Sequence, residues 1–429
     1  MRKKKNAFTL IELLAVIVIL AVILVIAIPR ILDVIETSKK DSIKSSARMI
    51  INSAEKKNMI DKVNGSTEEV TCDNSVKLSK EDYESCKITI DEEGKATINL
   101  VGKGKFDGYK CIGTNDNLAC GQVESITLPL NGKEYIEKLY NNELSRIENG
   151  LKKDNTEDQN IRYYGSNPNN YVSFNNELWR IIGVFGNNVK LVRSEKLGNL
   201  SWDSSESSVN KGWGVNEWSQ SDLKNYLNTM YYGGTSVTCY NGQNNQTTTC
   251  PTGTIEETSK ALIDNHTWNV GAIEEGETRK DTLAFYKAER GTKGKICSSG
   301  KWCNDTVTRK TEWTGYIGFP YVTDWAYASS ESVCETNMQK QDSSNAFICK
   351  NNNWMHYGST ISDSTWYLSP VASASVASYV WNVYGSGLAG NNAASNANAF
   401  FPTLYLKNNV QIISGTGTST DPYILKAGV

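Results

Sequence analysis

Two histidines are the side chains on which nucleophilic catalysis in this chain would depend. His266 lies in the tetrapeptide Asn-His-Thr-Trp and His356 in the tripeptide Met-His-Tyr. A Ser-His-Asp arrangement needs an imidazole beside the nucleophile, and the G-x-S-x-G motif that places such a serine is missing from the sequence. Both histidines are typical of packed or surface side chains. The sequence therefore predicts no catalytic residue, no cofactor and no enzyme activity.

Ten cysteines are the other reactive side chains, and all lie between Cys72 and Cys349. An even number confined to one part of a chain is typical of disulfides formed in an oxidising compartment. Metal binding is the alternative, but the chain has two histidines and no C-x-x-C motif, and we expect no metal site. The sequence leaves the connectivity open, and we favour five local disulfides between near neighbours: Cys72–Cys86, Cys111–Cys120, Cys239–Cys250, Cys297–Cys303 and Cys334–Cys349.

A single carboxylate, Glu12, lies at the head of an apolar run that extends without interruption from Leu13 to Ile28. Four basic residues at positions 2–5 precede the run, so the short leader should stay in the cytoplasm. A secretory signal peptide would end at a small-residue cleavage site, which this sequence does not show. A plain membrane anchor leaves Glu12 unexplained, because an acidic side chain at the membrane centre costs on the order of 2.5–3.5 kcal/mol.

Cleavage between Ala7 and Phe8 would explain the carboxylate, because the new α-ammonium group of Phe8 would then lie close to Glu12. A neighbouring copy of the chain could also pair its own terminus with this carboxylate. Residues 8–12 read Phe-Thr-Leu-Ile-Glu, and this N-terminus resembles the type IV pilins, pseudopilins and competence pilins. The resemblance implies cleavage by prepilin peptidase, N-methylation of Phe8, subunit alignment through Glu12 and a helix bend at Pro29. Ala7 replaces the glycine that is usual in the family.

The processing and assembly residues must be positioned by one long helix over residues 8–60. Beyond Pro29 the small and apolar residues Ile43, Ala47, Ile50 and Ala54 recur at steps of four, three and four, which is one face of an amphipathic helix. Residues 65–130 predict a small antiparallel sheet. Residues 87–91 and 96–100 alternate around a turn, and residues 109–112 form a third strand. By analogy with pilins, this sheet should pack on the helix.

A polar stretch and a change in composition separate the rest of the chain. We interpret residues 131–160 as a connector, since 152–160 lack apolar residues. All eleven tryptophans lie from Trp179 onward. Residues 178–185 and 189–193 predict a buried hairpin, Ser219 and Asp222 predict a helix start, and residues 385–399 predict a long surface loop. The predicted fold class is α+β, with a long N-terminal helix packed on a small antiparallel sheet, followed by a larger β-rich α+β domain over residues 161–429.

Residues 161–429 resemble a surface domain of unassigned function that is common in gut Firmicutes. The matching stretches are residues 164–172, 176–184, 325–328 and 402–407. The arrangement of strands and tryptophans looks like the C-type-lectin and formylglycine-generating-enzyme group, in which Cys334 and Cys349 could mimic a reactive pair. We favour a structural disulfide there. Exposed tryptophans stack on sugar rings, but we expect most of them in the core and one to three at the surface.

These observations favour a structural or binding role. The net charge is −2 and no basic patch follows the leader, so nucleic acid is not a favoured partner. We predict a leader at 1–7, a pilin-like module at 8–130 and a single-pass membrane protein with its C-terminal part extracellular. The expected partners are prepilin peptidase, other pilin subunits, the membrane and an extracellular glycan or protein ligand. The predicted function is a subunit of a type IV pilus or pseudopilus that displays a large domain for adhesion or ligand binding. The alternative is a membrane-anchored surface lectin or adhesin that does not assemble.

Overall fold

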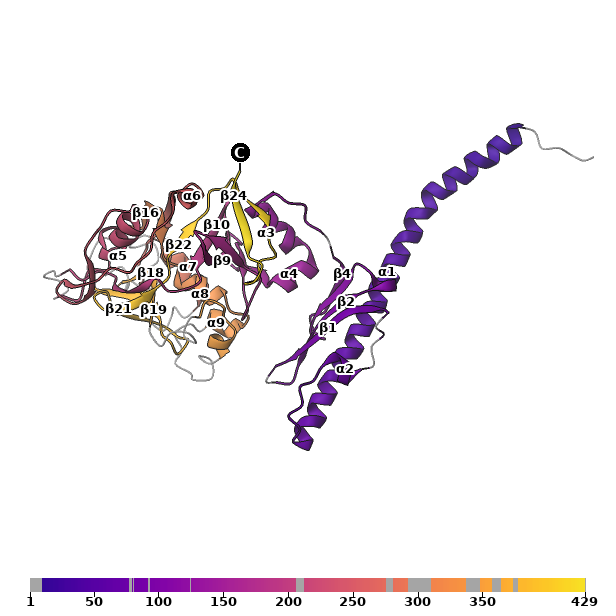
Figure 1. Ribbon diagram of the computed structural model, residues 1–429, viewed down its shortest axis with the longest axis horizontal. Helices are drawn as coiled ribbons and strands as arrows, with labels where there is room; N and C mark the ends of the chain where they lie inside the picture. Colours follow the sequence, from indigo (N-terminus) through magenta and orange to yellow (C-terminus); the bar gives the residue numbers. More distant parts are fainter. Residues whose placement is uncertain are drawn as a thin grey trace, which may run out of the picture. The chain divides into compact units, whose positions relative to one another are not determined.

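The chain forms two compact units, Met1–Ser125 and Ile126–Val429, each with its own apolar core. The computed structural model describes residues 10–76, 79, 81–91, 93–123, 125–205, 212–274, 281–291, 310–336, 348–356, 364–372 and 377–428. The predicted α+β fold class is confirmed, because a long N-terminal helix is followed by a larger region of mixed strands and helices (Figure 1).

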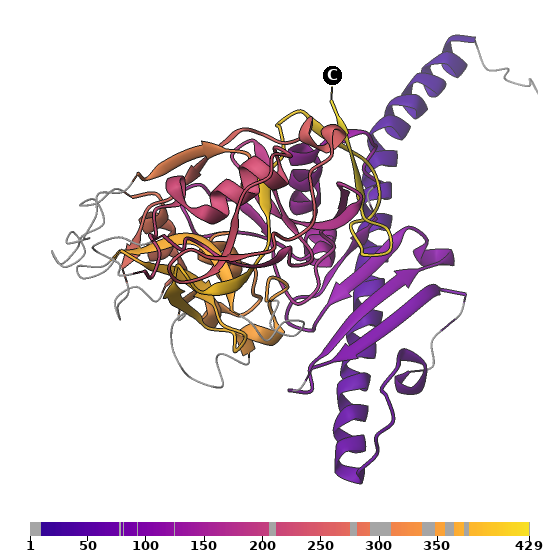
Figure 2. The same ribbon diagram turned by 60° about the vertical axis from the view of Figure 1, so that its left-hand side comes forward.

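The first unit is built on helix α1 (Leu10–Asn64). Its sequence favours a helix, since the segment contains no glycine and is rich in leucine, isoleucine and alanine at its start. The predicted apolar face is confirmed, with Ile43, Ala47, Ile50 and Ala54 completely buried. Figures 1 and 2 show the four-stranded sheet lying against the second half of α1, while the first half extends beyond this sheet.

The small sheet has the strand order β1-β2-β3-β4, and all neighbouring strands are antiparallel. Alternate residues of β2 are buried, so one face of the sheet packs on α1 and the other does not. The sheet has one strand more than the sequence indicated. The elements after α1 are α2 (Cys72–Ser75), β1 (Tyr83–Ile90), β2 (Ala96–Gly102), the 3-10 turn η1 (Gly104–Phe106), β3 (Tyr109–Gly113) and β4 (Ala119–Gln122).

The second unit contains, within its described residues, a ten-stranded and a six-stranded sheet that share one continuous core. The first has the order β17-β22-β10-β9-β8-β24-β23-β5, and β7 joins β6 to β9. Its strands are β5 (Leu130–Asn131), β6 (Leu151–Lys153), β7 (Ile161–Tyr163), β8 (Tyr171–Phe174), β9 (Glu177–Phe185), β10 (Asn188–Arg193), β17 (Ile317–Gly318), β22 (Thr403–Tyr405), β23 (Val410–Ser414) and β24 (Tyr423–Ala427).

The six-stranded sheet has the order β11-β21-β18-β19-β20, with β15 beside β18. Its central strand β18 is buried along its whole length. Its strands are β11 (Gly198–Ser201), β15 (Ile273–Glu274), β18 (Thr365–Ala372), β19 (Tyr379–Val383), β20 (Ala389–Ala393) and β21 (Ala397–Phe400). Two further strand pairs are β12 (Cys239–Gly242) with β13 (Gln246–Thr248), and β14 (His266–Asn269) with β16 (Glu312–Gly315).

Short helices connect these strands and pack on the core. Seven of the described ones are α3 (Gly132–Asn141), α4 (Glu143–Asn149), α5 (Asp222–Asn225), α6 (Glu257–Lys260), α7 (Thr282–Glu289), α8 (Val322–Tyr327) and α9 (Ser332–Thr336). The 3-10 turn η2 (Trp218–Gln220) precedes α5, and the π-helical turn η3 (Tyr226–Tyr231) follows it. Gly150 has a φ of 63° and ends α4, and a Cβ there would lie 2.5 Å from the Tyr164 carbonyl oxygen.

Three segments differ from the sequence predictions. The expected connector, residues 131–160, lies in the second unit, because Tyr135 and Ile136 of α3 join its core. The expected surface loop, residues 385–399, contains β20 and most of β21, since small alanine side chains fit inside the six-stranded sheet. The residue that caps α5 is Ser221, whose hydroxyl accepts a hydrogen bond from the Lys224 amide, and not Ser219.

Candidate functional site

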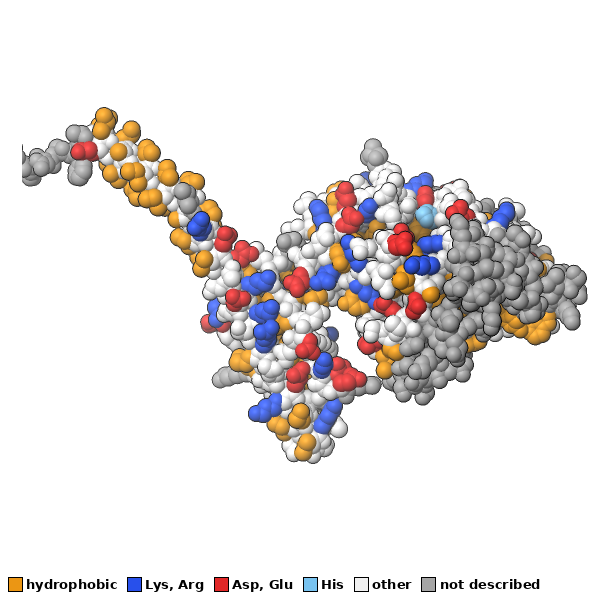
Figure 3. Space-filling model, turned by 180° about the vertical axis from the view of Figure 1, so that it is seen from behind, with side chains coloured by type: hydrophobic (Ala, Val, Ile, Leu, Met, Phe, Trp, Pro, Cys, Tyr) orange, Lys and Arg blue, Asp and Glu red, His pale blue; other side chains and the backbone are white. Residues whose placement is uncertain are grey.

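The first half of α1 exposes an apolar surface on every side. The described large apolar side chains between Leu10 and Ile35 are 46–84% exposed. The uncharged stretch from Leu13 to Pro29 spans roughly 25 Å at 1.5 Å per residue, close to the hydrocarbon thickness of a bilayer. Helix α1 is long and apolar enough to cross a membrane by length and composition. Figure 3 shows its apolar side chains as a band that gives way to charged side chains farther along.

The predicted assembly residues lie at the start of this apolar surface. Glu12 is exposed in the first turn of α1, where a carboxylate interacts favourably with the helix dipole. Pro29 lies inside α1, and the helix continues through it. The predicted cleavage residues Ala7 and Phe8 lie outside the described residues. The structure therefore places Glu12 and Pro29 on one continuous helix.

The second half of α1 is held to its sheet by apolar packing and two polar contacts. Glu55 accepts a hydrogen bond from the Ala96 amide at 3.0 Å, and Asn52 accepts one from the Asn115 side chain at 2.6 Å. These contacts connect the helix to the two ends of the β2–β3 pair. The sheet thus fixes one half of α1 and leaves the apolar half available for other partners.

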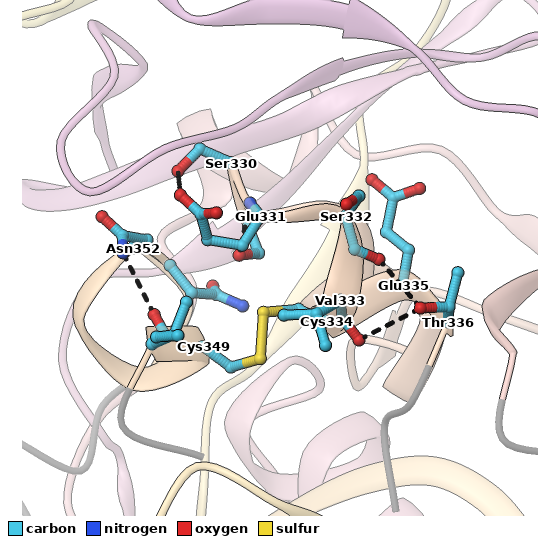
Figure 4. Close-up of a disulfide and its surroundings, with 12 residues drawn as sticks. Ser330, Glu331, Ser332, Val333, Cys334, Glu335, Thr336, Cys349 and Asn352 are labelled. Carbon is cyan, nitrogen blue, oxygen red and sulfur yellow. Dashed lines mark hydrogen bonds between the residues drawn. A yellow bond between two sulfur atoms is a disulfide. The ribbon is translucent and has the colours of Figure 1, made fainter. Parts of the chain in front are cut away.

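Four of the five predicted cysteine pairs form disulfides in the structure, and Cys297 and Cys303 lie outside the described residues. In the first unit, one disulfide joins α2 to β1 and another joins directly opposite residues of β3 and β4. In the second unit, Cys334 of α9 is bonded to Cys349 (Figure 4). The four disulfides are Cys72–Cys86, Cys111–Cys120, Cys239–Cys250 and Cys334–Cys349.

Neither histidine is arranged as the base of a nucleophile. His266 Nδ1 lies 3.0 Å from Asp264 Oδ2, and its ring stacks on Tyr405 with centroids 3.7 Å apart. Burial lowers the pKa of His266, although Asp264 opposes the shift. Burial also lowers the pKa of His356, to about 4. Among the described residues, no serine hydroxyl or cysteine thiol hydrogen-bonds to either imidazole ring.

Most of the described tryptophans belong to the core, as the sequence analysis expected. Trp202 and Trp218 pack edge to face with ring centroids 4.9 Å apart, and Phe319 lies beside both of them. Trp325 and Trp381 are completely buried. Trp213 is 42% exposed and is the most exposed tryptophan that the structure describes. Sugar stacking on an exposed ring therefore has one described candidate, and the remaining rings stabilise the fold.

Four buried charges lie where the sequence gave no signal. Arg162 of β7 bonds to Asp154 at 2.6 Å and to Asp324 of α8 at 2.7 Å, and Lys190 of β10 bonds to the second Asp324 oxygen at 2.5 Å. Burial favours the neutral form of Asp324, but Lys190 and Arg162 outweigh it and hold the pKa of Asp324 below its usual value. Removing one partner of such a group leaves an uncompensated buried charge. We interpret this cluster as structural.

The second unit also contains a cleft with a volume of about 640 Å³ that sequence reasoning did not find. We call it the Trp354 cleft, and its main walls are formed by Tyr171, Glu177, Arg180, Arg193, Trp354 and His356. The Arg180 guanidinium lies between two rings, 4.3 Å from the Tyr171 centroid and 4.5 Å from the Trp354 centroid. A signal that could have identified it is the position of His356, two residues after Trp354.

One wall of the Trp354 cleft is the segment 348–356. The Trp354 amide donates to the Gly165 carbonyl at 2.8 Å, and the Trp354 indole donates to the Tyr163 carbonyl at 2.9 Å. The Asn353 side chain donates to the Trp325 carbonyl at 2.6 Å. Figure 4 shows the Cys334–Cys349 disulfide joining this segment to α9. The wall is therefore held by one covalent bond and several hydrogen bonds.

Comparison with known proteins identifies the N-terminus. Residues 2–28 match the family model described as the prokaryotic N-terminal methylation motif. No curated protein and no solved structure matches the chain. The comparisons therefore do not support the predicted resemblance of residues 161–429 to a surface domain or to the C-type-lectin group. The N-terminus is type IV pilin-like, and this motif points to a structural subunit rather than an enzyme.

Proposed function

We propose that the chain is a pilin-like subunit that prepilin peptidase cleaves between Ala7 and Phe8 and that assembles into a type IV pilus or pseudopilus. The observation that carries the proposal is the methylation motif over residues 2–28 at the start of an exposed apolar helix. A pilin-type helix of this kind anchors the chain in a membrane before assembly. The mature chain would begin at N-methylated Phe8.

The exposed half of α1 supports assembly because apolar surface in water is unfavourable. A bilayer would cover it first, and the same half of neighbouring copies would cover it in a filament. The second half of α1 cannot fill this role, since Ile43, Ile50 and Ala54 are already buried against the chain's own sheet. The two halves of one helix therefore have separate tasks.

Glu12 supports a defined alignment between copies. Cleavage would create a positive charge on Phe8, four residues away, which is roughly 6 Å along a helix axis. A carboxylate and an ammonium group attract each other strongly where the dielectric constant is low. The α-amino group of one mature copy is therefore a suitable partner for Glu12 of the next copy.

The size of the second unit supports a display role. Residues 126–429 form a compact unit much larger than the helix-and-sheet unit. A subunit with such a domain suits a minor or tip position better than a densely packed major one, and adhesion or ligand binding outside the cell is the role we favour. The alternative is a membrane-anchored surface lectin or adhesin that never enters a filament.

The deciding experiment is mass spectrometry of the mature N-terminus from cells that naturally make the protein. A chain that begins at N-methylated Phe8 supports the proposal. A chain that still begins at Met1 contradicts it and favours the membrane-anchored alternative. Replacement of Ala7 by arginine provides the control, because a long charged side chain next to the cut bond should leave the leader attached.

A further inference from the structure

We propose that the Trp354 cleft binds a neutral oligosaccharide. The inference deepens the proposed function, since it rests on the second unit being displayed outside the cell and names the ligand class that it would meet there. The cleft lies wholly within the second unit. Its volume of about 640 Å³ is within the range of roughly 300–1,000 Å³ that is usual for small-molecule sites.

The charges that line the cleft are compensated by the protein. Arg193 is paired with Glu177 and also donates to the backbone carbonyls of Glu195 and Lys196, each at 2.8 Å. Arg180 donates to the Asn170 side chain at 2.8 Å and is stacked between two rings. Since its strong cations already have partners, the cleft does not select for an anion.

The remaining charges at the cleft are one of each sign. Lys350 and Glu195 both line it, so neither an anionic nor a cationic ligand is favoured by the sum. A ligand that enters must therefore be held by hydrogen bonds and apolar contact. This balance distinguishes the cleft from the arginine clusters that recognise phosphate or carboxylate groups.

Several lining groups both donate and accept hydrogen bonds, as sugar hydroxyls do. The rim carries hydroxyl groups at Ser166 and Ser419. Ser194 Oγ lies just beneath the surface without a hydrogen-bond partner among the described residues. The His356 imidazole is neutral above pH 5, and its two nitrogens then offer one donor and one acceptor, of which the Gly385 backbone can satisfy one.

The cleft also offers rigid apolar contact. Tyr171 is fixed in strand β8, Trp354 is held by its two hydrogen bonds, and Leu178 is 39% exposed beside them. Fixed side chains lose little conformational entropy when a ligand binds. A sugar has one apolar face and a hydroxyl rim, and this combination of apolar floor and amphoteric rim fits it.

The test uses the full chain purified from cells that naturally make it and reconstituted in lipid nanodiscs, which avoids detergents that contain sugars. An array of neutral oligosaccharides, with sialylated and sulfated oligosaccharides printed beside them, would identify the ligand class. We expect retention of neutral oligosaccharides. Titration with the best neutral oligosaccharide then gives the dissociation constant for variants.

Matched rim variants locate the site. Ser419→Trp should fill the cleft and weaken binding at least ten-fold, whereas Thr420→Trp, at the next exposed residue outside the cleft, should leave the dissociation constant within about two-fold. Ser194→Ala removes a hydroxyl that has no described partner, so the free protein should keep its stability while binding weakens roughly three- to ten-fold.

Three results would overturn the inference: no neutral oligosaccharide is retained, anionic oligosaccharides alone are retained, or Ser419→Trp binds as tightly as the unmodified chain. The N-terminal mass is measured on the same preparation, which separates this inference from the proposed function. A chain beginning at Phe8 that binds no neutral sugar would overturn the inference alone. A chain beginning at Met1 that binds sugar in the cleft would overturn filament assembly alone.

Discussion

Charged residues in this chain are placed in two opposite environments. Asp324 is completely buried and is compensated by Arg162 and Lys190. Glu12 is exposed at the head of an apolar helix half, where a membrane or a neighbouring copy would surround it. A buried charge that is fully paired stabilises one arrangement of the chain. A carboxylate on an assembly surface has instead to be matched by its partner.

Glu289 of α7 predicts a pH-dependent stability. It is completely buried, accepts a hydrogen bond from Thr323 at 2.8 Å, and burial raises its pKa to about 7. The folded chain holds this proton up to about pH 7, whereas the unfolded chain loses it near pH 4.5. Stability should therefore fall by about 3 kcal/mol as the pH rises from 4.5 to 7.

Replacing this residue by glutamine should remove the fall. We expect the unfolding free energy of Glu289→Gln to decline less than that of the unmodified chain between pH 4.5 and 7, as measured by denaturant titration at each pH. His356 acts in the opposite direction, because its lowered pKa makes stability rise with pH between about 4 and 6.5. That contribution is common to both proteins and cancels in their difference. Parallel pH profiles would contradict the assignment.

Glu12→Gln tests the assembly role of the carboxylate. The substitution keeps the size of the side chain and removes the charge that would pair with a neighbouring α-ammonium group. We expect normal cleavage and at least a roughly ten-fold loss of filament incorporation, equivalent to about 1.4 kcal/mol. Immunoblots of sheared surface filaments would measure it. Glu36→Gln, an exposed residue of the same helix beyond the uncharged stretch, should assemble normally, and equal incorporation of both variants would refute the role.

At the scale of elements, α1 combines two helices of different character in one uninterrupted rod. Its first half is apolar all round, which is typical of a membrane span or an assembly surface. Its second half is amphipathic and packs on a sheet of alternating buried residues. Short disulfide loops add to this sheet and to the second unit. The elements that carry function are thus attached to separately stabilised supports.

Ile50→Ala should weaken the attachment of α1 to its sheet. Ile50 is completely buried, so truncation should cost about 2–5 kcal/mol in the stability of the first unit. Hydrogen exchange of the β2 amides, followed by mass spectrometry, would report this loss. Met49→Ala is the matched control, because Met49 is 54% exposed and its truncation should change stability by less than about 0.5 kcal/mol. Similar exchange rates in the two variants would contradict the packing.

The Cys334–Cys349 disulfide should stabilise the wall of the Trp354 cleft. It closes a loop with a sequence separation of 15, for which loop entropy predicts about 3 kcal/mol. Replacement of both cysteines by serine should therefore speed hydrogen exchange at residues 353–356 and lower the unfolding free energy. The same replacement at Cys239 and Cys250 should leave exchange at residues 353–356 unchanged. If both double variants behave alike at this wall, the disulfide does not hold it.

At the scale of the whole molecule, the chain divides its tasks between two units with separate cores. The core of the first contains α1 and four strands, and that of the second joins residues from Tyr135 to Tyr423. All eleven tryptophans belong to the second unit, since the first of them is Trp179. Tryptophan fluorescence therefore reports on one unit alone, which makes a direct test of the division available.

Asp324→Asn should lower the stability of the second unit by about 3–5 kcal/mol, because Lys190 and Arg162 lose a buried partner. Denaturant unfolding followed by tryptophan fluorescence should show this as a lower midpoint. Ile50→Ala should leave the fluorescence midpoint unchanged while it weakens the first unit. A common shift of both units in either variant would show that they unfold together.

The sequence by itself determined the features that depend on neighbouring residues. The leader, the apolar run and Glu12 lie within about thirty residues, and residues 2–28 match a known motif. The buried face of α1 followed from helical periodicity, because residues three and four apart lie on the same side of a helix. Disulfides between near neighbours could be anticipated for the same reason, since a short loop brings its ends together at low entropic cost.

Only the tertiary structure decided which distant residues meet. Strand β24 pairs with β8, and β23 pairs with β5, so the end of the chain completes a sheet begun near residue 130. This pairing moved the expected connector into the core and created the Trp354 cleft from segments far apart in sequence. The buried cluster of Asp154, Arg162, Lys190 and Asp324 arises in the same way. Local periodicity shows which side of an element is buried, but the partner on that side is chosen by long-range strand pairing.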